Sequence, residues 1–218
     1  MPETTAPDLW RSLRDEVRHH HSRGRILLAV DGVDGAGKTR FADAFATAFD
    51  DVPVFRASVD GFHRPRAERY ARGRTSPEGF YRDSYDYAAF RSELIEPFRA
   101  GAPFRTAVWD VAADAPVDVA PQTAGPDAVL LVDGIFLHRP ELRGLWHWSL
   151  WLDVPVDVAF ARLGERDGTD PDHTAASNAR YRQGQELYLR EADPRRAASV
   201  IVDNTDFRHP SRVYRDFC

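Results

Sequence analysis

A phosphate-binding motif is the clearest chemical feature of the sequence. Residues 32–39 read GVDGAGKT and contain the only lysine among the 29 Lys and Arg residues of the chain. The stretch matches G-x-x-x-x-G-K-[ST], in which backbone N–H groups surround phosphates, the lysine reaches the β- and γ-phosphates, and the threonine hydroxyl can ligate Mg²⁺. A compact ammonium suits this position better than a planar, forked guanidinium. We therefore predict an ATP and Mg²⁺ site with contacts from Gly32, Val33, Asp34, Gly35, Ala36, Gly37, Lys38, Thr39 and Arg40.

The motif needs a strand before it and a helix after it, and the flanking sequence predicts both. Residues 25–31 (RILLAVD) form a short apolar run typical of a buried parallel strand. Phe41, Phe45 and Phe49 recur every four residues, which indicates one face of a helix beginning near Lys38. The positive end of that helix dipole would favour an anion. Gly32, Gly35 and Gly37 are expected to adopt positive φ in the intervening loop.

Alternation of strands and helices predicts the fold class. Further strands are expected over 52–60, 128–134, 148–154 and 198–204, and further helices over 86–98, from Pro155 onward and over 179–193. An N-terminal helix is expected within residues 1–23, where Leu9, Leu13 and Val17 share one face and Asp8 is the expected N-cap. This pattern predicts an α/β protein of the P-loop NTPase type, with a three-layer α/β/α arrangement and a five-stranded, mostly parallel sheet. The chain is expected to form a single domain over residues 1–218, with a β-hairpin flap in the Pro-, Ala- and Asp-rich segment 101–127.

Composition limits the expected binding partners and cellular location of the protein. The net charge of −5 disfavours a general nucleic-acid or anionic-membrane binder. The single cysteine, Cys218, excludes a disulfide within the chain and favours a reducing, cytoplasmic location. The opening MPETTAPDLW lacks a basic region followed by an apolar run, so no signal peptide is expected, and no apolar run approaches the ~20 residues of a membrane helix. The sequence leaves a homo-oligomer open.

An ordered set of motifs resembles the uridine kinase and phosphoribulokinase family of P-loop kinases. Beside the P-loop, it comprises DGFHRP (60–65), FYRDSYD (80–86), VWD (108–110) and VDGIF (132–136), and the likeness runs from about residue 25 to about residue 204. The resemblance implies a five-stranded parallel sheet, a substrate flap, and an arginine-bearing helical lid over about 162–185. It also implies ATP-dependent phosphorylation of a small alcohol, often a ribonucleoside 5′-hydroxyl.

Two acids match the catalytic and metal-binding positions of the family. Asp60 matches the catalytic aspartate after the second strand, and such a carboxylate can orient and deprotonate a hydroxyl or hold Mg²⁺ through water. Asp60 could equally cap the turn before Gly61. Asp133 follows four apolar residues, as a Walker-B acid does, and is expected to contact Mg²⁺ together with Thr39.

The substrate residues are also expected from the resemblance. Asp83 matches a ribose-binding aspartate, and Trp109 lies where the family places an aromatic side chain beside the nucleobase; a solvated loop acid and a flap anchor are the alternatives. The chain has DGFH where nucleoside-specific members have DSFY, so His63 is a candidate substrate contact, pH sensor or loop cap. Asp114 or a neighbour stands where those members offer a histidine to the pyrimidine.

The arginines of the expected lid complete the predicted site. Arg162 and Arg166, four residues apart, match lid arginines that neutralise the transferring phosphate, and Arg166 would also contact the substrate. Arg180 and Arg182 are weaker candidates. An ordinary salt-bridged helix surface has the same pattern.

The function predicted from these residues is ATP-dependent phosphorylation of a small-molecule hydroxyl, most simply the 5′-hydroxyl of uridine or cytidine. The alternatives are a kinase for another nucleoside, a pantothenate-like vitamin or a sugar, and a nucleotide-binding switch without phosphotransfer. The form GxDGxGKT also resembles thymidylate kinases, but their DR[YH] segment is missing.

Overall fold

A six-stranded sheet forms the centre of the protein, whose computed structural model describes residues 5–214. The strand order is β2-β5-β1-β6-β7-β8. The first five strands in this order run parallel, and β8 pairs antiparallel with β7. The strands are β1 (Arg25–Gly32), β2 (Val54–Ser58), β5 (Ala128–Gly134), β6 (Trp148–Asp153), β7 (Val200–Asp203) and β8 (Ser211–Val213).

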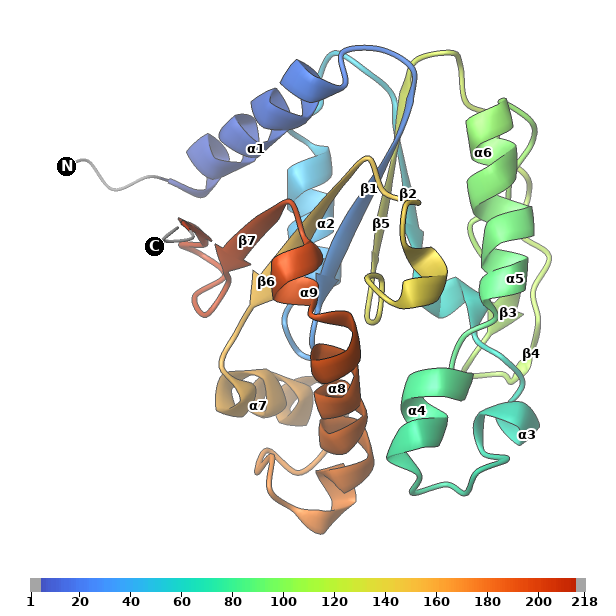
Figure 1. The fold of residues 1–218 in the computed structure, drawn as a ribbon, viewed down its shortest axis with the longest axis vertical. Coiled ribbons are helices and arrows are strands. Elements are labelled where there is room, and N and C mark those ends of the chain that lie inside the picture. The colour runs from blue at the N-terminus through green and yellow to red at the C-terminus, as the bar shows by residue number, and fades with distance from the viewer. Residues whose placement is uncertain (1–4, 215–218) are drawn as a thin grey trace.

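Helices cover both faces of this sheet, which gives three layers (Figure 1). Alternate residues of β1 face opposite sides: Leu28 packs with α1 (Ala6–His20) and α2 (Lys38–Ala46), whereas Leu27 packs with α4 (Pro77–Asp83), α6 (Glu96–Ala100) and α8 (Ala179–Ala192). The remaining helices are α3 (Arg66–Arg69), α5 (Tyr87–Ala89), α7 (Val156–Asp167) and α9 (Pro194–Ala197). The predicted α/β fold with a five-stranded parallel sheet is confirmed, and the three-residue edge strand β8 was missed.

Several helix predictions need local correction. Thr5, rather than Asp8, is the N-cap of α1, and Asp8 is the third helical residue of the same capping box. The helix predicted over 86–98 consists of α5, a π-helical stretch (Phe90–Ile95) and α6 in succession. Helix α4 was not predicted, although Ser76 caps it and Pro77 occupies its first position.

The segment predicted as flap contains little regular structure, whereas the segment predicted as lid is formed by parts of two helices. The hairpin in 101–127 consists of two-residue strands, β3 (Trp109–Asp110) and β4 (Ala115–Pro116), and Val108 N donates to Gly61 O at 2.8 Å. The segment 162–185 covers the end of α7, a loop and the start of α8. Residues 1–4 of the N-terminal segment and Cys218 lie outside the described residues. Across residues 5–214, no helix is long and apolar enough to span a membrane.

Candidate active site

The sheet topology brings the predicted site together at one edge. The P-loop, residues 32–39, follows β1, Asp133 lies near the end of β5, and Asp60 follows β2. Because β5 lies between β1 and β2, Asp133 lies between the P-loop and Asp60. In register, Asp133 is beside Val30 on one side and Ser58 on the other. This is the carboxyl edge of a parallel sheet, where α/β proteins bind ligands.

Two glycines give the P-loop its turn. Gly35 and Gly37 have φ of +77° and +84°, which a side chain would strain. A Cβ atom at Gly35 would also lie 2.1 Å from the carbonyl oxygen of Ala159 on α7. Gly37 is the N-cap of α2, so the helix begins directly at the loop. The prediction of positive φ at Gly32 was wrong, because Gly32 is the last residue of β1.

A pocket of about 300 Å³ lies over the P-loop, and we call it the phosphate pocket. Lys38 Nζ donates to the carbonyl of Val33 at 2.9 Å. Thr39 Oγ1 donates to Asp133 Oδ2 at 2.7 Å. The residues that line the pocket are Asp34, Gly35, Gly37, Lys38, Thr39, Arg40, Asp60, Asp133, Gly134, Ile135 and Arg166. Most of the predicted nucleotide and metal residues therefore surround one hollow.

The Asp133 carboxylate is held from both sides. Its second oxygen, Oδ1, accepts from Arg56 Nη2 at 2.8 Å, and its side chain is only 3% exposed. Arg56 also donates to the Leu131 carbonyl at 2.7 Å. Thr39 and Asp133 provide adjacent oxygen donors of the kind that Mg²⁺ prefers, so the donor set fits this ion. Residues 5–214 contain no cluster of three or more His, Cys, Asp or Glu able to hold a metal.

Asp60 is oriented by an aromatic neighbour. The Tyr85 hydroxyl donates to Asp60 Oδ1 at 2.8 Å. His63 Nδ1 lies 2.8 Å from the Asp60 carbonyl oxygen, and its ring centroid lies 4.5 Å from that of Tyr85. Burial lowers the pKa of His63 and raises the pKa of Tyr85, so both rings are neutral at pH 7.

A second pocket, of about 270 Å³, opens beside the phosphate pocket. The aromatic side chains of Phe80, Tyr85 and Tyr181 line it. Asp34, Asp60, Ile135 and Arg166 line both pockets. The two hollows therefore share a border at which a phosphate and a bound hydroxyl could meet.

Asp34 is the P-loop side chain at that border. Desolvation raises the pKa of its carboxyl group, and the neighbouring Asp60 carboxylate adds to this, whereas Lys38 opposes it. The backbone N–H of Asp34 donates to Gln185 Oε1 at 2.9 Å.

The predicted arginines divide between different surroundings. Arg166 lines both pockets and pairs with Asp167 at 2.7 Å. Arg162 does not line the phosphate pocket, because its Nη2 donates to the carbonyls of Asn204 and Thr205 at 3.0 and 2.7 Å. Of the two weaker candidates, Arg180 is buried against Tyr70, and Arg182 pairs with Glu186 at 2.9 Å.

Comparison with known proteins identifies kinases of related fold. The chloroplastic uridine/cytidine kinase of Arabidopsis thaliana is 24% identical over 168 residues, which cover 72% of this chain and 33% of that protein. The uridine kinase of Streptococcus uberis is 26% identical over 151 residues (66% and 69%), and the thymidylate kinase of Xanthomonas campestris is 31% identical over 158 residues (69% and 65%). The chain thus spans only about a third of the length of the Arabidopsis protein. No family model matches the sequence.

Solved structures share almost the whole fold. A proposed uridine kinase from Bacillus stearothermophilus superposes with a TM-score of 0.63 at 22% identity, covering 87% of this chain and 98% of the other. Phosphoribulokinase from Rhodobacter spheroides gives a TM-score of 0.56 at 17% identity, covering 83% and 70%. The fold, the P-loop motif and the uridine kinase relatives all indicate a P-loop kinase. At this level of identity, these relatives and solved structures support the resemblance to uridine kinase and phosphoribulokinase-like P-loop kinases.

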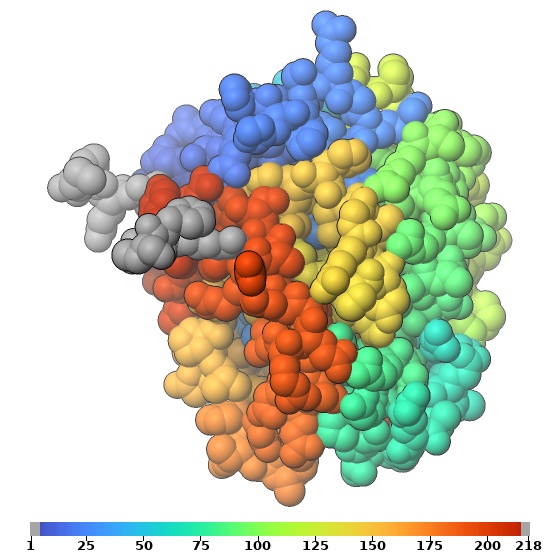
Figure 2. Space-filling view, viewed as in Figure 1, coloured from blue at the N-terminus to red at the C-terminus, as the bar shows by residue number. Residues whose placement is uncertain are grey.

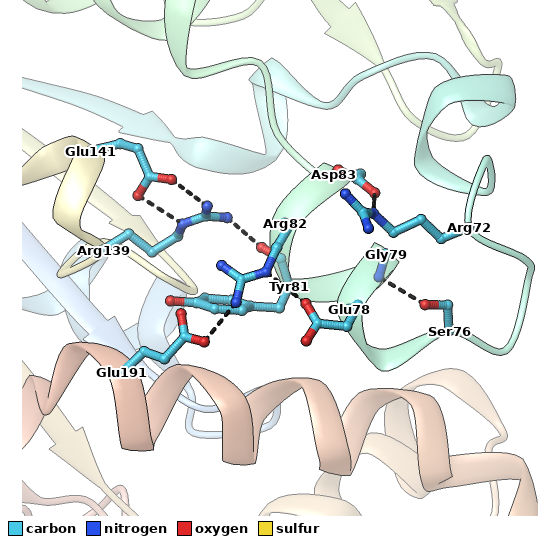
Figure 3. Close-up of polar contacts among 10 residues, drawn as sticks. All are labelled: Arg72, Ser76, Glu78, Gly79, Tyr81, Arg82, Asp83, Arg139, Glu141 and Glu191. Atoms are coloured by element: carbon cyan, nitrogen blue, oxygen red, sulfur yellow. Dashed lines mark hydrogen bonds and ion pairs between the residues drawn. The ribbon is translucent and has the colours of Figure 1, made fainter.

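Three residues matched to substrate positions of the family lie outside both pockets. Asp83, at the end of α4, pairs with Arg72 at 2.8 Å (Figure 3). Trp109 lies in β3 opposite Pro116, and its indole Nε1 is buried without a hydrogen-bond partner within the described residues. Asp114 accepts from the backbone N–H of Arg66 at 2.8 Å. Their roles as substrate residues therefore stay predictions.

Three residues of the observed site were not predicted from the sequence. Arg56, which holds Asp133, stands between the apolar residues Phe55 and Ala57 of β2, and that interruption was an available signal. Tyr85 follows the FYRDS segment, and no local sequence pattern indicates its hydrogen bond to Asp60. Gln185 reaches the P-loop from 151 residues further along the chain, and no local pattern indicates this contact.

Proposed function

We propose that this protein is an ATP-dependent kinase that transfers the γ-phosphate to a hydroxyl of an uncharged small molecule, most simply the 5′-hydroxyl of uridine or cytidine. The observation that carries the proposal is the shared border of the two pockets at Asp34, Asp60 and Arg166. In this proposal ATP occupies the phosphate pocket and the alcohol occupies the second pocket, which we then call the acceptor pocket.

The residues at the border have the chemistry that phosphoryl transfer requires. Asp60, with Tyr85 bound to one carboxylate oxygen, can use the other oxygen to orient the acceptor hydroxyl and take its proton. Lys38 would leave the Val33 carbonyl and bind the β- and γ-phosphates. Arg166 would add positive charge beside the transferring group.

Thr39 and Asp133 would hold Mg²⁺, with Asp60 reaching it through water. When bound, this ion neutralises charge on the β- and γ-phosphate oxygens. Arg56 occupies one oxygen of Asp133 and thereby orients the other toward Thr39.

The charges of the acceptor pocket favour an uncharged alcohol. Three carboxylates, those of Asp34, Asp60 and Asp167, line it together with one arginine, Arg166, which is already paired with Asp167. His63 adds no charge at pH 7, because burial lowers its pKa. A phosphorylated acceptor would bring a second anion beside these carboxylates without a free cation to offset it. The aromatic side chains of Phe80, Tyr85 and Tyr181 suit a flat ring such as a pyrimidine.

The remaining alternatives differ in their acceptor. Another nucleoside or a sugar is also neutral, so the charge argument leaves both open, whereas the carboxylate of pantothenate is disfavoured. A switch without phosphotransfer would have no need for an acceptor pocket that borders the phosphates. A cytoplasmic location belongs to the same proposal, because the one cysteine of the sequence permits no internal disulfide.

The test is release of ADP from Mg-ATP with a panel of ribonucleosides, deoxynucleosides, sugars, pantothenate and phosphorylated acceptors. We expect release with neutral ribonucleosides and none above background with phosphorylated acceptors. Release that no alcohol stimulates would support the switch, and preference for a phosphorylated acceptor would refute the charge argument.

A further inference from the structure

Helix α8 supports the P-loop from behind through two buried side chains. Gln185, only 5% exposed, accepts from the backbone N–H of Asp34 at 2.9 Å. One turn further along, the Tyr188 hydroxyl donates to one carboxylate oxygen of Asp31. The other oxygen of Asp31 accepts from the backbone N–H of Gly32 at 2.8 Å. One helix therefore holds the first turn of the P-loop at both ends.

A cavity lies on one side of this turn. It has a volume of about 630 Å³ and lies between β6, α7 and α8, and both Val33 and Gln185 line it. Its wall is mostly apolar and includes Trp151, Phe160 and Leu189. Val33 borders this cavity and also packs against the hydrophobic core, and the hydrogen bonds from α8 add to that restraint on the loop.

Helix α8 also packs against α4, which contributes to the acceptor pocket. The space-filling view shows the orange-red residues of α8 directly against the green residues of α4 (Figure 2). A Cβ atom at Gly184 would lie 2.6 Å from the Phe80 ring, so only glycine permits this approach. Glu191 of α8 pairs with Arg82 of α4 at 2.6 Å (Figure 3). Phe80 of α4 and Tyr181 of α8 stack edge to face at 5.0 Å, and both line the acceptor pocket.

We propose that Gln185 is a positioning residue through which α8 couples the two halves of the site. An acceptor in contact with Phe80 and Tyr181 restrains α8, and Gln185 passes that restraint to the amide of Asp34. The acceptor therefore raises the affinity of the P-loop for ATP, and ATP raises the affinity for the acceptor by the same factor, typically ~5–150-fold. This inference rests on the proposed kinase function, because it takes the second pocket as the acceptor site.

Calorimetry measures this factor directly. A non-hydrolysable ATP analogue is titrated in magnesium buffer with and without saturating uridine, using the unaltered protein, Gln185→Met and Gln183→Met. Methionine keeps the length of glutamine but cannot accept the amide, and Gln183 is an exposed glutamine on the same helix. We expect uridine to tighten analogue binding at least ~5-fold in the unaltered protein and in Gln183→Met, and less than ~2-fold in Gln185→Met. A role limited to stability would not change this factor.

Equal coupling factors in the two glutamine variants would overturn the proposal. If the kinase assay shows that uridine is an acceptor, a coupling factor of one in the unaltered protein would overturn it as well. Hydrogen exchange tests the contact without any acceptor. The Asp34 amide should exchange at least ~10-fold faster in Gln185→Met than in Gln183→Met, and equal protection would overturn the role of Gln185. Should Gln185→Met fail to fold, Gln185→Leu, which also offers no acceptor to the Asp34 amide, takes its place, and unchanged exchange at Asp34 would overturn the proposal. Failure of every alcohol to accept phosphate would refute the kinase function while leaving the exchange comparison decisive for Gln185.

Discussion

Replacing Arg56 by methionine should destabilise the fold, because it leaves the Asp133 carboxylate buried without its cation. The Arg56 and Asp133 side chains are 24% and 3% exposed, and their N and O atoms lie 2.8 Å apart. Thr39 is the remaining hydrogen-bond donor to this carboxylate among the described residues. A single hydroxyl cannot offset the desolvation of a full negative charge.

The expected magnitude follows from this burial. Removing one partner of a buried ion pair costs ~3–5 kcal/mol. Because water reaches about a quarter of Arg56, part of the freed space can hydrate the carboxylate, so we take the lower end, ~3 kcal/mol. For a chain of this size each kcal/mol lowers Tm by ~2–4 °C, which gives a decrease of ~6–12 °C.

Urea unfolding followed by tryptophan fluorescence, with calorimetry for Tm, measures this change at pH 7 without nucleotide. Arg11→Met is the matched control, because Arg11 pairs with Asp8 at the surface with 64% of its side chain exposed. Its cost should stay below ~1 kcal/mol. The double variant Arg56→Met, Asp133→Asn should recover part of the lost stability, since no uncompensated charge remains.

The reasoning would be refuted by an Arg56→Met variant within ~0.5 kcal/mol of the unaltered protein, a change typical of surface substitutions. A double variant less stable than Arg56→Met would also contradict it, because the loss would then come from packing rather than from the charge of Asp133.

Four further predictions concern the site. Lys38→Ala should abolish ADP release while leaving Tm close to that of the unaltered protein; residual turnover near the normal rate would exclude its role at the phosphates. Asp60→Asn should lower kcat by ~10²–10⁴ with nearly intact ATP binding, as loss of a positioned base does, and full activity would remove the role assigned to it. Asp83→Ala should raise KM for a diol acceptor more than KM for ATP if Arg72 releases it on binding, whereas an effect on ATP alone would reassign it. Burial lowers the pKa of His63, so on acidification below about pH 6.5 this side chain takes up its proton in the unfolded chain first, which lowers the stability of the folded protein. Between about pH 7.5 and 5.5, Tm should therefore fall less for His63→Gln than for the unaltered protein. Equal decreases in Tm would show that His63 does not contribute.

The fold was predictable where a local pattern is repeated. The apolar runs of β1, β5 and β6 and the four-residue spacing of Phe41 and Phe45 each depend on neighbours in the sequence. Strand β8 was not predicted, because three residues are too few to show an alternation of apolar and polar side chains. Helix α4 was not predicted, because its sequence contains a glycine, Gly79, which lies close to the backbone of Arg69.

The motif residues of the site were predictable from the sequence, but the distant residues that hydrogen-bond to them were not. Lys38, Thr39 and Asp133 were expected together, and a hydrogen bond now joins Thr39 to Asp133. The bond from Asp34 to Gln185 joins residues 151 positions apart, and the bond from Arg56 to Asp133 joins residues 77 positions apart. Such contacts depend on which elements the sheet order places side by side, and no local spacing specifies that.

In the proposed function, the P-loop and the neighbouring pocket form one site for phosphoryl transfer. The most direct test of this function is incubation with γ-labelled ATP, magnesium and uridine, followed by separation of the products. We expect label in uridine 5′-monophosphate, and none when Lys38 is replaced by alanine. Label that stays in ATP or appears only as inorganic phosphate, with uridine and with every other neutral alcohol tested, would contradict it.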